Sequence, residues 1–301
     1  MKQFEYGVSD YKLICALADG EISIIGARGS GSSIEIPEEI EYEGNLYVVT
    51  SIEKKTFLGL SALREVVLPK SVKNIGDWAF AQCARLTNVC IPFETEIGVG
   101  VFDGCPCLLQ ICIEKEEEDF SLDLSILLAT CVTKLPSEDL LRDVELGSTH
   151  WYQKWDQRLL NFLNEDDKEG YQTMVLCGEE DIRKDVPEYI FEKQMDKCSL
   201  CMIRLLYNEG IEKDTAKAYI DYILSHIKGC ESDAAWKVIM RDYSDRLVFY
   251  DLLADIGGIT KDNVDAMIED LDSQYAEARA YLIRYKQEHF AKEDAFSMFD
   301  L

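Results

Sequence analysis

The fold of the first third of the chain is decided by the stretch Ile75-Gly76-Asp77-Trp78-Ala79-Phe80-Ala81-Gln82-Cys83 and its continuation Leu86-Thr87-Asn88-Val89-Cys90-Ile91-Pro92. Its apolar positions recur one copy earlier and one copy later, in steps of 22 or 23 residues: Ile52, Ile75 and Ile97; Phe57, Phe80 and Phe102; Leu63, Leu86 and Leu108. A period in the low twenties with this spacing predicts a solenoid in which each copy contributes one short parallel strand.

The predicted fold is multidomain α and β, with a short leucine-rich repeat solenoid followed by an all-α domain of helical hairpins. Residues 1–45 are expected to form a β-hairpin cap and an incomplete first rung, because short alternating apolar runs there are separated by turn signals. Residues 46–114 hold the rungs. The charged run 114–119 interrupts the repeat, so we place the domain boundary within 114–120 and assign 115–301 to the helical domain.

The repeated motif resembles the BspA-type (treponemal) leucine-rich repeat, I-G-x-x-A-F-x-x-C-x-x-L-x-x-V-x-I-P. The element Phe102-Asp103-Gly104-Cys105 repeats its F-x-G-C portion, whereas Leu60 replaces the cysteine of the first rung and Glu114 the proline of the last. The resemblance covers about residues 20–114. It implies a bacterial repeat architecture that binds proteins and is found largely on cell surfaces.

The remainder of the chain has helical periodicity. Trp155, Leu159 and Leu163 keep helical spacing, and Pro136 and Pro187 stand where helices can begin. A weaker repeat at an offset of 48 residues pairs Gly210 with Gly258, each expected to adopt a left-handed conformation that ends a helix. The other matching pairs are Leu205 with Leu253, Ile211 with Ile259, Lys213 with Lys261, Asp214 with Asp262, Ala218 with Ala266, and Ile220 with Ile268. The arrangement is similar to ankyrin-like helical tails, although the ankyrin T-P-L-H signature is absent.

Charge and cysteine usage limit the partners and the compartment. The net charge of −26 repels nucleic acid and anionic lipid, so we expect neither nucleic acid nor a membrane as a partner. The N-terminus has no signal-peptide core, and no segment reaches the roughly 18 apolar residues of a membrane span. The 11 cysteines are expected to be reduced thiols. We therefore expect a cytoplasmic protein, or a surface or secreted one if it is exported by another route or within a larger assembly.

The candidate binding surface is the concave face of the solenoid. Outward strand positions place Glu65, Val67, Asn88, Cys90, Gln110 and Cys112 there in two rows, and Trp78 widens the contact from the loop side. Cys90 and Cys112 should lie on adjacent rungs, but two thiols with no further ligand make a poor zinc site, so we expect neither metal nor cofactor.

Other motifs have structural explanations. Cys83 with Cys105, and Cys198 with Cys201, are expected to be buried, and the histidines show no catalytic partners. The run Gly26–Ser32 is expected to be a hairpin loop, because a strand and not a helix follows it. Among the aromatic residues expected at the surface are Trp78, Trp151, Tyr152 and Trp155, with core packing as the alternative for Trp151 and Trp155.

These observations favour a non-enzymatic scaffold that binds protein or peptide through the concave face and a helical-repeat partner domain. The alternative is an enzyme of unknown class with a site at the domain junction or in the helical half. A third hypothesis is one module of a larger secreted assembly. No catalytic constellation is evident in the sequence.

Overall fold

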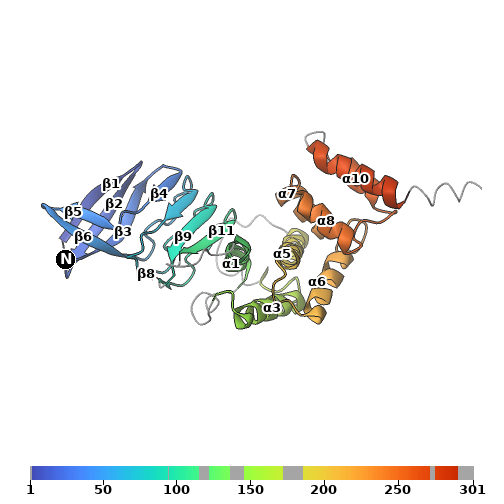
Figure 1. Ribbon diagram of the computed structural model, residues 1–301, viewed down its shortest axis with the longest axis horizontal. Helices are drawn as coiled ribbons and strands as arrows, with labels where there is room; N and C mark the ends of the chain where they lie inside the picture. Colours follow the sequence, from blue (N-terminus) through green and yellow to red (C-terminus); the bar gives the residue numbers. More distant parts are fainter. Residues whose placement is uncertain are drawn as a thin grey trace, which may run out of the picture. The chain divides into compact units, whose positions relative to one another are not determined.

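The computed structural model describes residues 2–93, 95–114, 122–135, 146–171, 186–271 and 275–290 (Figure 1). It divides into two compact units, Met1–Trp155 and Asp156–Leu301, and the division falls inside helix α3 (Thr149–Asn164). Among the described residues, the last strand ends at Glu114 and the first helix begins at Leu122. The domain limits drawn from sequence remain a prediction.

A four-stranded parallel sheet forms one side of the solenoid. Its order is β11-β9-β7-β4, which is the reverse order of the rungs along the chain. The strands are β4 (Ser33–Glu35), β7 (Glu65–Val67), β9 (Asn88–Pro92) and β11 (Gln110–Glu114). The predicted parallel solenoid is confirmed, but one strand per repeat is wrong, because the repeats also contribute the short strands Asn74–Ile75 and Glu96–Ile97 to a second sheet.

A second, seven-stranded sheet joins the N-terminal cap to the rungs. Its strands are β1 (Lys2–Val8), β2 (Tyr11–Ala18), β3 (Glu21–Gly29), β5 (Glu39–Tyr42), β6 (Asn45–Ile52), β8 (Asn74–Ile75) and β10 (Glu96–Ile97). The first three strands form an antiparallel meander, and β3, β6, β8 and β10 continue as a parallel ladder. The cap therefore has strands β1 and β5 in addition to the hairpin expected from sequence.

The sequence predicts a hairpin loop over Gly26–Ser32. This prediction is wrong for the first four residues, which belong to β3. Gly26 pairs with Ile14 and Gly29 pairs with Tyr11 across the meander. A side chain at Gly29 would collide with the Asp10 carbonyl, so glycine here permits close approach of two strands. The glycines that suggested a flexible turn instead serve strand packing.

The solenoid core consists of repeated columns of the same residue type. The rings of Phe57 and Phe80 stack with centroids 4.9 Å apart, and those of Phe80 and Phe102 are 6.0 Å apart. Leu63, Leu86 and Leu108 are buried beside them. The thiols of Cys83 and Cys105 each donate a hydrogen bond of 3.1 Å to a carbonyl of the preceding rung, at Phe57 and Phe80 respectively. The predicted columns are confirmed.

Eight helices follow in the described part of the chain. Besides α3 they are α1 (Leu122–Lys134), α5 (Val186–Leu206), α6 (Lys213–Ser225), α7 (Ala234–Asp242), α8 (Leu247–Asp255), α9 (Val264–Asp270) and α10 (Ala276–His289). Helix α1 packs against β11 and so covers the last rung, while α5 contacts α6, α7 and α8. None of the helices over the described residues has the length and apolarity needed to cross a bilayer.

The weaker 48-residue repeat is only partly reflected in the backbone. Gly210 is left-handed at φ +66°, as predicted, but in the second copy the left-handed residue is Gly257, at φ +77°, and not Gly258. Pro187 is the second residue of α5, as expected from its tolerance in a first helical turn. Pro136 lies outside the described residues.

A buried ion pair joins three helices of the second unit. The Arg204 guanidinium on α5 makes two hydrogen bonds to the Asp156 carboxylate on α3, at 2.8 and 3.0 Å. The Tyr219 hydroxyl on α6 donates to the same carboxylate at 3.0 Å. Burial and the nearby Asp156 raise the pKa of Tyr219 well above its ordinary value, so the hydroxyl keeps the proton that it donates.

Phe80→Ala tests the stacked phenylalanine column. It removes the ring that contacts both neighbours, so we expect unfolding free energy to fall by about 3–5 kcal/mol. Chemical denaturation of the full chain measures the change. The matched control is Leu58→Ala, at a 40% exposed turn position, which should cost within about 0.5 kcal/mol. Equal losses of unfolding free energy in the two variants would contradict a stabilising role for the stacked phenylalanine column.

Asp156→Ala tests the buried ion pair. Arg204 would then be a buried cation without its carboxylate, so a loss on the order of 3–5 kcal/mol is expected. Far-ultraviolet circular dichroism during urea denaturation reports it. Asp265→Ala removes the same group from the exposed Lys286 pair and should cost at most about 1 kcal/mol. Similar costs for both variants would refute the assigned importance of Arg204.

Candidate functional site

Outward side chains of the four-stranded sheet form two straight rows, which together we call the strand face. Strand register places them opposite one another: the first row is Ser33, Glu65, Asn88 and Gln110, and the second is Glu35, Val67, Cys90 and Cys112. The alternating residues Val66, Val89 and Ile111 are at most 1% exposed, as the strand pleat requires. All six strand residues predicted from sequence thus lie together on one face.

The strand face is neutral over the outward positions of β9 and β11 and carries carboxylates over β4 and β7. Asn88 and Gln110 present neighbouring carboxamides that can both donate and accept hydrogen bonds. Val67, Cys90 and Cys112 make the adjoining row apolar and thiol-bearing, and all five side chains are half-buried. The exposed carboxylates are Glu35 on β4, Glu65 on β7 and Glu114 at the end of β11. The part of the face over Asn88, Gln110, Cys90 and Cys112 can bury against a partner without desolvating charges of its own.

The two cysteines on this face are neighbours on adjacent strands. Cys90 and Cys112 are direct register partners on β9 and β11. Burial raises the pKa of the Cys90 thiol to about 11, and the neighbouring Cys112 adds to that shift. Cys90 is therefore a protonated thiol at neutral pH rather than a reactive nucleophile.

Trp78 lies outside the two rows, in the turn between β8 and β9. Its backbone is left-handed at φ +53°, and Lys55 and Gly100 hold the same conformation at matching positions of the neighbouring rungs. The ammonium groups of Lys54 and Lys55 lie 4.6 and 5.5 Å from the indole centroid. A side chain at Gly100 would meet the indole, so this glycine makes room for Trp78. Its role in widening the contact remains a prediction.

The expected exposure of three aromatic residues in the helical half is wrong. Trp151 and Trp155 are 0% exposed and Tyr152 is 4% exposed. The Trp155 indole donates to the Leu127 carbonyl on α1 at 3.3 Å. Trp151, Trp155 and Leu159 follow one another at four-residue steps, which is the spacing of a packing stripe. Core packing, the stated alternative for the two tryptophans, is what the structure shows.

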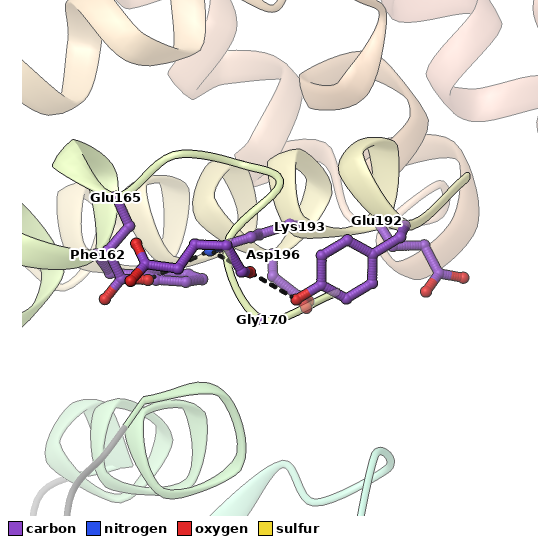
Figure 2. A pocket seen from close by; sticks show the side chains of 8 residues that line it. Phe162, Glu165, Gly170, Glu192, Lys193 and Asp196 are labelled. Carbon is purple, nitrogen blue, oxygen red and sulfur yellow. Dashed lines mark hydrogen bonds and ion pairs between the residues drawn. The ribbon is translucent and has the colours of Figure 1, made fainter. Parts of the chain in front are cut away.

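A pocket of about 420 Å³ lies beside α5, and the sequence did not suggest it. It is lined by Phe162, Glu165, Glu169, Gly170, Tyr189, Glu192, Lys193 and Asp196. Figure 2 shows Phe162 and Glu165 at one end and Glu192 at the other. Lys193 donates to the Asp166 and Glu169 carbonyls at 3.0 and 3.2 Å, and Tyr189 donates to the Glu169 carbonyl at 2.9 Å. These polar groups fix the segment after α3, so their contacts have a structural explanation.

A second hollow, of about 740 Å³, lies along β8 and β10 on the other sheet. Gly76 and Gly98 contribute to its lining. A side chain at either glycine would lie 2.5 Å from a backbone nitrogen of the preceding rung, at Lys54 and Asp77 respectively. The repeated Ile-Gly pairs in the sequence are the signal that predicts this close approach.

The remaining candidate groups are structural. Cys198 and Cys201 are fully buried on α5, as predicted, and burial raises the pKa of both thiols. His226 ends α6, and its ring stacks on Tyr222 with centroids 4.3 Å apart. Within the described residues, no three side chains of the metal-binding types are placed to hold an ion.

Comparisons with known proteins agree with the repeat motif. Residues 32–123 match the BspA type leucine rich repeat region, in six copies. A leucine-rich repeat protein from Bacteroides ovatus is 28% identical over 36% of this chain and 29% of its own, with a TM-score of 0.33. The T. pallidum leucine rich repeat protein is 28% identical over 33% of this chain and 46% of its own, with a TM-score of 0.30.

A leucine rich cell surface protein from Faecalibacterium prausnitzii is 26% identical over 38% of this chain and 33% of its own, with a TM-score of 0.31. This chain therefore spans less than half the length of each of these three proteins. A search of curated proteins gave no match. The helical region is not identified as ankyrin. Residues 32–123 are thus similar to the BspA type leucine rich repeat region.

Proposed function

We propose that the protein is a binding scaffold that holds a segment of a partner protein against the strand face. The observation that carries this proposal is the pair of in-register rows, in which carboxamides run beside an apolar and thiol-bearing row. Leucine-rich repeat proteins typically bind proteins, and the repeat family points to a non-catalytic scaffold. Solenoids offer extended surfaces because packing uses only their inward positions.

The dimensions of the strand face favour a short extended segment. Adjacent strands are about 4.8 Å apart, so four strands span roughly 14 Å between the first and last. That distance matches four to five residues of extended chain at about 3.3 Å each. Such a segment can lie across the rungs, with its polar groups against Asn88 and Gln110 and its apolar groups against Val67, Cys90 and Cys112.

The alternative of an enzyme in the helical half has weaker support. The pocket beside α5 is lined by carboxylates, Lys193 and Tyr189, and the ammonium and hydroxyl groups hold the loop after α3. Among the described residues that line this pocket there is no histidine or cysteine. Its composition offers neither a nucleophile with an adjacent base nor a pair of donors converging on one point.

The double variant Val67→Arg with Gln110→Arg tests the proposal. Both side chains point outward, so the fold should persist, while two added guanidinium groups should block the centre of the strand face and abolish partner retention. Proteins captured from a lysate by the parent and the variant, quantified by mass spectrometry, give the comparison.

The matched control is Leu58→Arg with Asn74→Arg. It replaces one apolar and one carboxamide side chain, adds the same charge, and uses exposed positions off the strand face. Partners retained by the parent and the control but lost by the strand-face variant would support the proposal. Equal retention by all three, with the variants folded, would mean that binding occurs elsewhere.

A further inference from the structure

Two thiols stand directly opposite each other on the last two strands of the strand face. Cys90 on β9 pairs with Cys112 on β11, and the pairs Val89 with Ile111 and Ile91 with Ile113 on either side fix that register. Both cysteines are half-buried, so a small ligand can reach them from solvent.

We propose that Cys90 and Cys112 form a two-sulfur site for a soft metal ion, with monovalent copper as the ion that fits best. Thiolate sulfur selects soft ions such as Cu(I). A d¹⁰ Cu(I) ion is stable with two sulfur ligands, whereas structural zinc takes four. Since the described residues hold no cluster of three such ligands, this pair can satisfy copper but not zinc.

The ladder geometry lets the two side chains converge on one ion. Opposed residues on neighbouring strands lie about 4.7–4.9 Å apart, and their side chains leave the same face of the sheet. A metal with bonds to sulfur of about 2.3 Å accepts sulfur atoms up to roughly 4.6 Å apart when the two bonds are collinear. The same strand spacing lies within the Cα separation of about 4.4–6.8 Å that a disulfide accepts, so a disulfide is the competing outcome.

A second cysteine column shows why only this pair is accessible. Cys83 and Cys105 also occupy adjacent rungs, but they are 0% and 2% exposed. Their sulfur atoms already donate to backbone carbonyls of the preceding rungs. Cys107 and Cys230 are exposed but lie outside the strands, in a turn and a bend. Among the described cysteines, the combination of exposure and strand register belongs to Cys90 and Cys112.

Copper binding must displace the protons of the two thiols. The ligating form is the thiolate, so copper affinity should rise as pH increases, about tenfold per unit for each proton released. This dependence separates a thiolate site from adventitious binding to surface carboxylates, which are already ionised. The site does not depend on the proposed partner-binding function.

Anaerobic titration of the reduced full chain with Cu(I), in competition with the chelator bicinchoninate, tests the proposal. We expect one Cu(I) per chain, with affinity at least tenfold weaker in Cys90→Ser and equally in Cys112→Ser. The matched control, Cys107→Ser with Cys230→Ser, also removes thiols and should bind like the parent. Binding unchanged in Cys90→Ser, or copper left wholly with the chelator, would overturn the proposal.

A readout on the unaltered chain covers the case in which a serine variant misfolds. Cu(I) should protect Cys90 and Cys112 from alkylation by N-ethylmaleimide, while Cys107 and Cys230 stay reactive, as mapped by peptide mass spectrometry. X-ray absorption should show two sulfur ligands. Protection confined to any other cysteines, or ready oxidation of the metal-free protein to a Cys90–Cys112 disulfide, would refute the assigned site.

Discussion

Hydrogen-bonded register between neighbouring rungs is the constraint on which the solenoid depends. Side chains alternate between the two faces of a strand, so a slip of one residue would turn Val89 outward and Cys90 into the core. The stacked phenylalanine rings and the thiol-to-carbonyl hydrogen bonds reinforce the same alignment from inside. The strand face is a product of this constraint, because residues fixed in register on adjacent strands necessarily form rows.

The helical unit is organised by a different interaction. A buried guanidinium binds a carboxylate on another helix and two backbone carbonyls, so Arg204 holds α3 and α5 together with the loop that follows α5. Burying a charge is unfavourable unless its partners are complete, which makes such a cluster intolerant of change. The repeat unit instead distributes its stability over similar contacts in every rung. Outward residues of the repeat unit can therefore vary more readily, because they carry little of its packing.

Sequence predicts the parts of this protein in which packing repeats. The columns of Phe80 and Leu86, and the rows containing Asn88 and Cys90, follow from the period combined with strand alternation. Strands β1 and β5 were not predicted, because a cap strand occurs once and has no second copy for comparison. Tyr152 was misplaced on the surface because it lies one residue off the four-residue spacing of Trp151 and Trp155, for which core packing was the stated alternative. The partner remains a proposal, since outward residues are not constrained by the core.

The contacts of each rung reach only its immediate neighbours, and this sets how such a chain can change in length. Removing one complete repeat of 22 or 23 residues leaves a shorter ladder with the same contacts, whereas removing one or two residues misaligns every later strand. Viable insertions and deletions therefore come in whole rungs, and each widens or narrows the strand face by about 4.8 Å. Helix α1 packs on the final strand, so an added rung preserves that contact only where it is inserted between existing rungs.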